Sequence, residues 1–253
     1  MDILASRRGA VMTVQFNRPQ RKNALTWEMY ALLNDALAEA EADDAVRAVL
    51  FHGGNDVFTA GNDVEDFIRR PPLGEDTPVF TFLRAVAGAS MPLVAAVNGP
   101  AVGIGTTLLL HCELVYAGDN ARFHMPFTSL GLVPEFASSY LLPLVAGYQR
   151  AAELLLLGEP FGAEKAREAG FVTRIVPAAE TIDAGWEAAG KLAALPPKSL
   201  RVTKALLKGG HAAAIRAQML AEGEHFRTML HEPAAREALA AFMEKRKPDF
   251  SKL

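Results

Sequence analysis

Cysteine is almost absent from this sequence: of its 253 residues, Cys112 is the only one. A single thiol cannot form a disulfide within the chain, which favours a reducing compartment. No apolar run reaches the roughly 18 residues that a membrane-spanning helix needs. The N-terminal residues also lack the basic start and apolar run that are typical of a signal peptide. We therefore expect a soluble, cytoplasmic protein that does not act at a membrane.

A strong charge and several common catalytic patterns are missing too. The formal net charge is -3, so the basic surface typical of nucleic-acid-binding proteins is not expected. No serine lies in a G-x-S-x-G elbow, and no Walker A motif occurs. The glycines at 99, 103 and 105 do not have the G-x-G-x-x-G spacing of dinucleotide-binding proteins. The histidines form no H-x-x-x-H pair, so we expect no metal site.

Alternating strand and helix patterns organise most of the chain. Short runs of β-branched and apolar residues predict strands at 10–16, 46–52, 93–97, 113–117, 122–125 and 171–176. Helices are expected from Thr26, as N-cap, through Ala40, and at 81–89, 103–110, 148–157 and 163–169. The prolines of 71–78 indicate a mobile insertion, and 178–247 is almost entirely helical in pattern. We predict an α/β fold with a core domain at 1–195 and a helical C-terminal region at 196–253.

One carboxylate stands alone in an apolar stretch. Glu135 lies between Pro134 and Phe136, and no other acidic or basic residue occurs between His124 and Arg150. Apolar neighbours would raise the pKa of such a carboxyl group towards neutrality, as in a general acid or base. The alternative is an ordinary acid in the first turn of a helix, where proline and glutamate are both common. The residues by themselves leave both interpretations open.

Two loops contain small residues at positions where a ligand could approach the backbone. Ala60-Gly61 follows a predicted strand, and Gly103-Ile104-Gly105 precedes a predicted helix. The first N–H groups of a helix have no partner within it. Two such groups from separate loops would form an oxyanion hole. The alternative is that these glycines only make tight turns.

Four segments, taken together, resemble the enoyl-CoA hydratase/isomerase (crotonase) family. They are N-R-P-Q-R-K-N-A-L at 17–25, F-T-A-G-N-D at 58–63, N-G-P-A-V-G-I-G at 98–105 and A-F-M-E-K-R-K-P-D-F at 241–250. Their order and spacing match the family along nearly the whole chain. The resemblance implies a crotonase-like ββα superhelix core, a helical C-terminal trimerisation region, and a homotrimer or dimer of trimers. It also implies an acyl-CoA thioester substrate and no separate cofactor, since coenzyme A is part of the substrate.

The resemblance also implies roles for particular residues. The backbone N–H groups of Ala60 and Ile104 would be the oxyanion donors. The residues implied to bind the substrate are Arg21, Lys22, Ala24, Gly61, Asp63, Gly103, Thr107, Phe127, Leu132 and Lys245. The basic members of this set would meet the phosphates of coenzyme A, although exposed cations are ordinary on any surface. Asp63 is also expected to cap a short helix.

Two departures from the family pattern bear on the reaction. Hydratases of the family carry glutamates where this chain has Thr107 and Phe127, so hydration is expected to be weak or absent. The segment L-G-L-V-P-E-F-A-S-S-Y at 130–140 instead resembles the Δ3,Δ2-enoyl-CoA isomerases, especially the peroxisomal type, in which the acid at the position of Glu135 shuttles the proton. We therefore predict an enzyme that converts a 3-enoyl-CoA to the trans-2-enoyl-CoA. The alternatives are a hydratase-like enzyme of other enolate chemistry, such as dehalogenation or thioester cleavage, and a non-catalytic acyl-CoA-binding protein.

Overall fold

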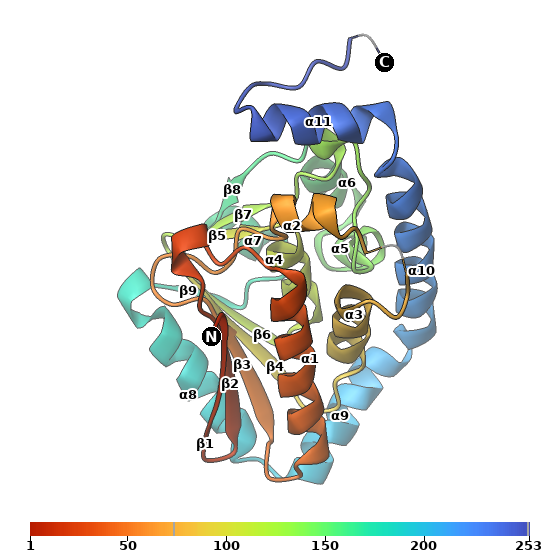
Figure 1. Ribbon diagram of the computed structural model, residues 1–253. Helices are drawn as coiled ribbons and strands as arrows, with labels where there is room; N and C mark the ends of the chain where they lie inside the picture. Colours follow the sequence, from red (N-terminus) through yellow and green to blue (C-terminus); the bar gives the residue numbers. More distant parts are fainter. Residues whose placement is uncertain (73, 252) are drawn as a thin grey trace.

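A twisted, mostly parallel sheet forms the centre of the computed structural model, which describes residues 1–72, 74–251 and 253 (Figure 1). Within these residues the sheet has six strands in the order β1-β2-β3-β4-β6-β9. The strands are β1 (Ile3–Arg8), β2 (Val11–Phe16), β3 (Ala48–His52), β4 (Leu93–Val97), β6 (Leu114–Gly118) and β9 (Arg174–Val176). Only β1 runs antiparallel to its neighbour, and the other pairings are parallel.

Helices cover both faces of this sheet, which explains the continuous apolar character of β3 and β4. Side chains alternate along a strand, so Val49 and Phe51 face α1 (Trp27–Ala42) and α3 (Pro78–Gly88), while Leu50 faces α8 (Thr181–Ala193). Figure 1 shows α8 on one side of the sheet and α1 and α3 on the other. All five residues of β3 and of β4 are buried.

A second sheet consists of three short strands. Its strands are β5 (Pro100–Val102), β7 (Arg122–His124) and β8 (Phe161–Gly162). The short α-helices of the chain are α2 (Val64–Arg69), α4 (Ile104–Thr107), α5 (Ser138–Ala146), α6 (Tyr148–Ala152) and α7 (Ala163–Glu168). Single turns add η1 (Pro19–Arg21), η2 (Leu108–His111), η3 (Thr128–Leu130), η4 (Glu153–Leu157) and η5 (Ala178–Glu180).

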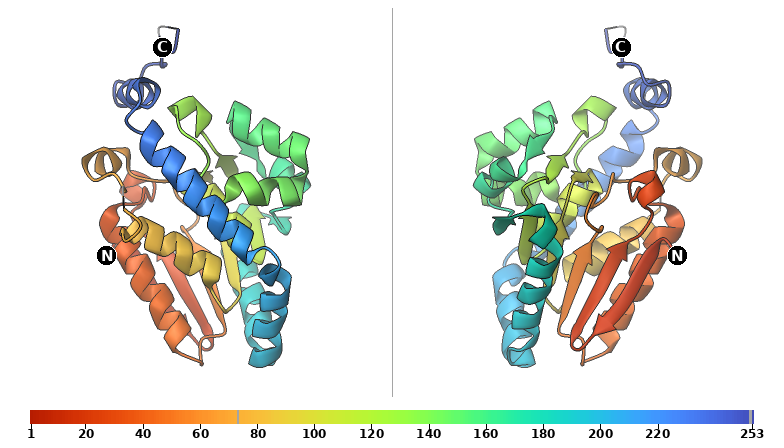
Figure 2. Two further views of the ribbon diagram at one scale, coloured as in Figure 1. Left: turned by 90° about the vertical axis from the view of Figure 1, so that its right-hand side faces the viewer. Right: turned by 90° about the vertical axis from the view of Figure 1, so that its left-hand side faces the viewer.

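Three helices end the chain: α9 (Pro197–Gly209), α10 (Ala212–Met229) and α11 (Pro233–Met243). From α9, the buried ammonium group of Lys204 donates to the carbonyl oxygen of Met91 at 2.6 Å and pairs with Glu113 at 3.1 Å. Figures 1 and 2 show α10 running obliquely along the outside of the molecule and α11 crossing its upper end. The described helices include none that combines the length and the apolar character needed to cross a membrane. The boundary between 195 and 196 stays a prediction.

Most predicted elements occur within a few residues of their expected positions, and the α/β class is confirmed. The caps are confirmed as well: Thr26 accepts a hydrogen bond from the N–H of Met29, and Asp63 accepts one from the N–H of Asp66. The sequence interpretation omitted β1, β5, β8 and α5. It also began the last strand too early, because residues 171–173 do not belong to β9. Pro78, assigned to the insertion, begins α3; residue 73 of that insertion lies outside the described residues, and its mobility stays a prediction.

Candidate active site

A cavity of about 590 Å³ lies where the two sheets, the loop before α5 and the C-terminal helices meet. Its wall is largely apolar and includes Phe226 of α10 and Leu239 and Phe242 of α11. Eleven of the predicted site residues lie on this wall, namely Arg21, Lys22, Ala24, Ala60, Gly61, Asp63, Gly103, Ile104, Phe127, Leu132 and Glu135. A largely apolar cavity with a few polar groups is the usual form of a small-molecule site. The structure thus brings most of the predicted set to one place.

Glu135 differs from the other two acids of the cavity wall, Asp63 and Glu65, which form ion pairs with arginines. It lies in the loop that precedes α5, not in the first turn of a helix, so the interpretation as an ordinary helix-start charge does not apply. The residue is partly exposed because it faces the cavity, but protein atoms enclose its carboxyl group. Burial is the main cause that raises the pKa of Glu135, and the charge of Glu222 adds to it, while a hydrogen bond from the hydroxyl of Thr107 lowers it; together they place the pKa at about 8. The group can therefore exist in either protonation state near neutral pH.

Thr107 belongs to the site although it is not among the residues that line the cavity. It lies on α4, is fully buried, and donates its hydroxyl hydrogen to Oε1 of Glu135. Phe127 is also buried against the cavity. Neither position supplies a second carboxylate beside Glu135.

The hydrogen bonds of the 59–63 loop correct the predicted oxyanion donor. The N–H of Ala60 donates to the carbonyl oxygen of Lys22 at 2.9 Å, and that of Gly61 donates to Oγ1 of Thr59 at 3.1 Å. Neither group is free for a ligand. The N–H of Asn62 has no partner among the residues that the structure describes, and Asn62 lies on the cavity wall. The free donor of this loop is therefore Asn62, not Ala60, because the loop satisfies the N–H of Ala60 internally.

On the facing segment, the free donor is the one predicted. The N–H of Gly103 donates to the carbonyl oxygen of His124 at 2.8 Å. Ile104 is the first residue of α4, and its N–H is without a partner in the described part of the chain. An oxygen atom of a ligand can therefore accept a hydrogen bond from this N–H, as it does in an oxyanion hole.

Close backbone packing places the two segments side by side. Gly61 has φ +83°, and a Cβ atom there would lie 2.6 Å from the carbonyl oxygen of Val102 and 3.9 Å from the nitrogen of Gly103. Only glycine fits this position without displacing the backbone. The side chain of Asn62 is fixed as well, because its Oδ1 accepts a hydrogen bond from the hydroxyl of Tyr30 at 2.6 Å.

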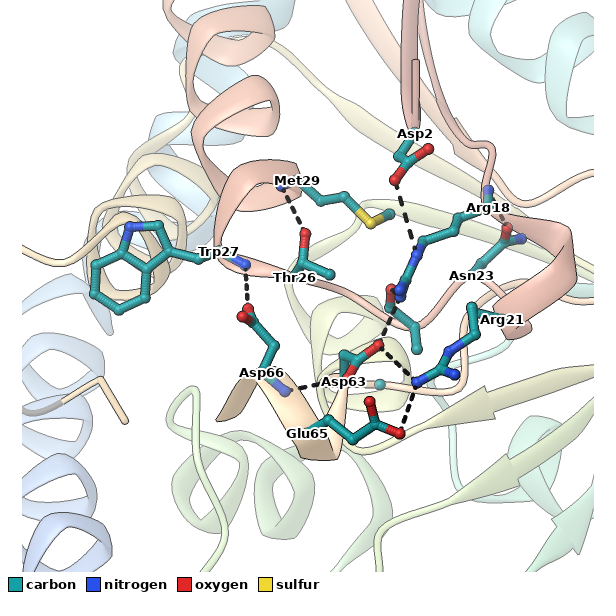
Figure 3. A network of polar contacts seen from close by, with 12 residues as sticks. Asp2, Arg18, Arg21, Asn23, Thr26, Trp27, Met29, Asp63, Glu65 and Asp66 are labelled. Carbon is teal, nitrogen blue, oxygen red and sulfur yellow. Dashed lines mark hydrogen bonds and ion pairs between the residues drawn. The ribbon is translucent and has the colours of Figure 1, made fainter. Parts of the chain in front are cut away.

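A network of polar contacts lies beside the cavity (Figure 3), and three of its members, Arg21, Asp63 and Glu65, line the wall. Arg18 donates to Asp63 at 2.7 Å, and Arg21 pairs with Glu65 at 3.1 Å. Burial acts to raise the pKa of Asp63, but the hydrogen bonds from Arg18 and from the N–H of Asp66 outweigh it and hold this pKa below its usual range. Asp63 thus joins the 18–21 segment to α2, and its expected contact with a substrate stays a prediction.

The basic residues expected to meet phosphates differ in their placement. Arg21 and Lys22 are exposed and lie on the wall of the cavity. Lys245 is exposed and is not among the lining residues, whereas its neighbour Arg246 is. Arg246 pairs with Glu237 and Glu244. Among the described residues, no cluster of His, Cys, Asp or Glu is suited to hold a metal ion.

With this geometry in view, comparison with known proteins identifies the family. The family model described as enoyl-CoA hydratase/isomerase matches residues 6–252. The chain belongs to this family. The description of the family names hydratases and isomerases of enoyl-CoA, an acyl-CoA thioester.

The relatives of this crotonase-family chain are named for different activities. The chain is 39% identical over 212 residues to enoyl-CoA delta isomerase 2 of Rattus norvegicus, covering 81% of this chain but only 54% of the rat protein. It is 35% identical to 1,2-epoxyphenylacetyl-CoA isomerase of Escherichia coli, with 98% of each chain covered. The crystal structure of an enoyl-CoA hydratase/isomerase from Pseudoalteromonas atlantica is 43% identical, covers 99% of this chain and 100% of that one, and superimposes with a TM-score of 0.94. The predicted crotonase fold is confirmed.

Proposed function

We propose that this crotonase-family protein is a Δ3,Δ2-enoyl-CoA isomerase. The observation that carries the proposal is Glu135, a cavity acid with a pKa of about 8 and without a carboxylate at Thr107 or Phe127, whereas the other acids of the wall, Asp63 and Glu65, are ion-paired. Moving a double bond needs one group that takes a proton and returns it. Adding water needs further groups that activate the water molecule. One acid poised near neutrality therefore fits isomerisation better than hydration.

The proposed reaction uses the backbone donors and the acid in turn. The thioester oxygen accepts hydrogen bonds from the N–H groups of Asn62 and Ile104, and the carboxylate of Glu135 removes a proton from C2 of the 3-enoyl chain. The electron pair of that C–H bond becomes part of a dienolate, whose negative charge the two N–H groups stabilise. The protonated Glu135 then returns the proton to C4, which gives the 2-enoyl thioester and restores the carboxylate. Bonds, protons and charge balance without water or a cofactor.

Apolar surroundings support the same steps. Phe127, Leu132 and Phe226 lie on the cavity wall. They favour a neutral acyl chain and limit the access of water to the dienolate. The N–H groups stabilise the negative charge of the dienolate more strongly where they are fixed in place and shielded from water, because electrostatic interactions are stronger at low dielectric constant.

The test is a double-bond assay on the wild type and on Glu135→Gln. The purified wild type is expected to convert a 3-enoyl-CoA to the 2-enoyl-CoA. Glu135→Gln, which preserves shape but cannot take a proton, is expected to lower kcat by roughly 10²- to 10⁴-fold. The exposed Glu159 provides a matched control, because Glu159→Gln removes a carboxylate that does not line the cavity. Near wild-type turnover by Glu135→Gln would refute the proposal.

Two other products would identify the alternatives. A 3-hydroxyacyl-CoA as the main product would indicate a hydratase, and release of free coenzyme A would indicate thioester cleavage. Binding of enoyl-CoA without any turnover would indicate a non-catalytic acyl-CoA-binding protein. The arrangement of Thr107, Phe127 and Glu135 leads us to expect none of these three outcomes.

A further inference from the structure

The turn directly after Glu135 has an unusual backbone. Phe136 has φ +62° and Ala137 has φ +55°, so two consecutive residues with side chains adopt the left-handed conformation. Each such residue costs about 1–2 kcal/mol relative to an ordinary conformation. The turn persists only where neighbouring groups stabilise it. These groups also fix the direction in which the side chain of Glu135 points.

From one side, the carboxylate of Glu222 on α10 holds this turn. Its Oε2 accepts a hydrogen bond from the N–H of Ala137 at 2.6 Å, and its Oε1 accepts one from the N–H of Ser139 at 3.0 Å and another from the hydroxyl of Ser139. The hydroxyl oxygen of Ser139 in turn accepts a hydrogen bond from Gln218 at 2.8 Å. No side chain of α5 or of its N-cap residue caps that helix, so Glu222 supplies the cap from another element.

From the other side, His111 holds the same turn. Its ring stacks on that of Phe136 with the centroids 4.0 Å apart, and its Nε2 lies 2.8 Å from the carbonyl oxygen of Phe136. Burial lowers the pKa of His111 to about 3, so the ring is neutral. Because a carbonyl oxygen only accepts, the proton of this ring is on Nε2 and donates to Phe136.

Glu222 is almost completely enclosed, and no positive charge pairs with it in the described structure. It is 5% exposed, and its burial raises its pKa to about 7. The other titratable groups around Glu135 are Tyr30 on α1, which is buried, and His111 on η2. Lys204 and Lys208 approach His111 from α9, and both pair with Glu113. Burying an acid with three donors beside a second acid lowers the stability of the fold, so stability alone does not explain this arrangement.

We propose that Glu222 is a positioning residue: from the C-terminal helix α10 it fixes the left-handed Phe136–Ala137 turn and so aims the carboxyl group of Glu135 into the cavity. This inference rests on the proposed function, because it takes Glu135 as the group that moves the proton. Glu222 does not line the cavity, so its effect on the reaction is indirect. It acts on the base through the backbone and through its own negative charge.

The decisive variant is Glu222→Gln. The amide keeps the size of the side chain, but one of its two ends donates, so it cannot accept hydrogen bonds from Ala137 and from Ser139 at once. We expect kcat to fall roughly 10- to 100-fold, the loss typical of a reacting group displaced by about 1 Å, with KM changed less than about threefold. Removal of a like charge also lowers the pKa of Glu135. The acid side of the pH profile of kcat/KM is therefore expected to move to lower pH.

Two further variants separate charge from geometry. Ser139→Ala removes one donor to Glu222 but leaves a carboxyl group there, so it is expected to lower kcat while moving the acid side of the profile less than Glu222→Gln does. Glu224→Gln removes an exposed carboxylate of the same helix and serves as the matched control for Glu222→Gln. A residue with only a structural role would change the melting temperature and the amount of folded protein, and would leave the pH profile of the folded enzyme where it was.

A direct titration makes the result independent of turnover. Enzyme labelled with 13C at its glutamate carboxyl groups, with Glu135 assigned from the Glu135→Gln variant, reports the pKa of Glu135 by NMR. A lower pKa in Glu222→Gln than in the wild type supports the inference even if the wild type proves to have no isomerase activity, an outcome that would refute only the proposed function. An unchanged pKa together with an unchanged kcat would overturn the positioning role of Glu222.

Discussion

Glu135 combines two demands at the scale of one residue. To remove a proton from C2 it must be ionised, and to return the proton to C4 it must release it readily. A carboxyl group with an ordinary pKa near 4.5 is too weak a base for the first step, whereas a pKa of about 8 raises its basicity towards that of the enolate it forms. The apolar environment thus improves the base at the expense of the fraction that is ionised at neutral pH.

The pH dependence of the reaction follows from this pKa. Because the base must be ionised in the free enzyme, kcat/KM is expected to rise with pH and to level off above about 8. At pH 6 it is expected to be about a hundredth of its plateau, since two pH units separate that pH from the pKa. The measurement is the initial rate from pH 5.5 to 9.5 at low substrate concentration. A flat profile between pH 6 and pH 8 would contradict the assigned base.

Thr107→Val tests how the hydrogen bond from Thr107 affects the pH dependence of the reaction. The hydroxyl of Thr107 donates to the carboxylate of Glu135 and so lowers its pKa. Valine has nearly the same shape but cannot donate, so the rise of kcat/KM is expected to shift to higher pH. Thr107→Ser keeps the hydroxyl and is expected to leave the midpoint in place. A midpoint that stays constant in Thr107→Val would show that this hydrogen bond does not tune the base.

The sequence revealed Glu135 and concealed Asn62 and Glu222 for physical reasons. Glu135 stood out as the one acid of an apolar segment. The role of Asn62 depends on which N–H groups the loop already satisfies, and this is a property of the folded backbone. A signal for Glu222 did exist, since it shares the buried face of α10 with Ile215 and Met219 at helical spacing, whereas Glu224 does not. An acid at such a position is a candidate for a buried role.

At the scale of elements, the site depends on how closely the 59–63 loop approaches the segment before α4. The bridges Leu25–Asn62 and Thr59–Ala101 place the loop between two neighbouring segments. Gly61 packs closely against the carbonyl oxygen of Val102, so the direction of the next N–H, that of Asn62, depends on it. The geometry of one proposed donor is therefore set by backbone packing and not by any side chain that a motif would display.

Gly61→Ala tests this dependence. The added Cβ would lie 2.6 Å from the carbonyl oxygen of Val102, so the loop must shift and carry the N–H of Asn62 with it. We expect kcat to fall at least tenfold, because loss of one oxyanion donor costs roughly 10²–10³ in rate. Gly54→Ala is the matched control: its φ is +89°, but the added Cβ has nothing within 4 Å. That variant is expected to lose about 1–2 kcal/mol of stability and to retain its kcat. Equal turnover by the two variants would contradict the proposed donor geometry.

Elements buried on both faces were the easiest to predict from the sequence. The limits of β4 match the prediction because all its residues are apolar and covered. In contrast, β1 has one buried residue and five exposed ones, and it exists by pairing with β2, so its composition gives no strand pattern. Helix α5 was missed because Pro143 lies inside it and its first residues follow the left-handed turn.

At the scale of the molecule, the C-terminal helices complete the site that the core begins. Helices α10 and α11 supply Phe226, Leu239 and Phe242 to the cavity wall, and α10 supplies Glu222 behind it. A fold that closes its cavity with its last helices cannot form the site until those helices have packed. The expected trimer or dimer of trimers stays a prediction; exposed apolar residues such as Leu206 and Leu207 of α9 are compatible with it.

The proposed base also affects the stability of the whole molecule, with a definite sign. The pKa of Glu135 is about 8 in the folded protein and near 4.5 in the unfolded chain. Below pH 4.5 both states hold the proton, and the acid has no effect on the free energy of unfolding. Between these values the unfolded chain ionises while the folded protein does not, so stability is lost as the pH rises towards 8.

Glu135→Gln removes this loss. Glutamine does not titrate and can still accept the hydrogen bond from Thr107. Relative to the wild type, the variant is expected to gain on the order of 4 kcal/mol in free energy of unfolding between pH 5 and pH 8.5, because each unit of pKa difference corresponds to about 1.4 kcal/mol. Urea unfolding at both pH values and at equal protein concentration measures the difference, with Glu159→Gln as control. If the difference between Glu135→Gln and the wild type were the same at both pH values, the carboxyl group would have an ordinary pKa, and its role as a base near neutrality would have to be abandoned.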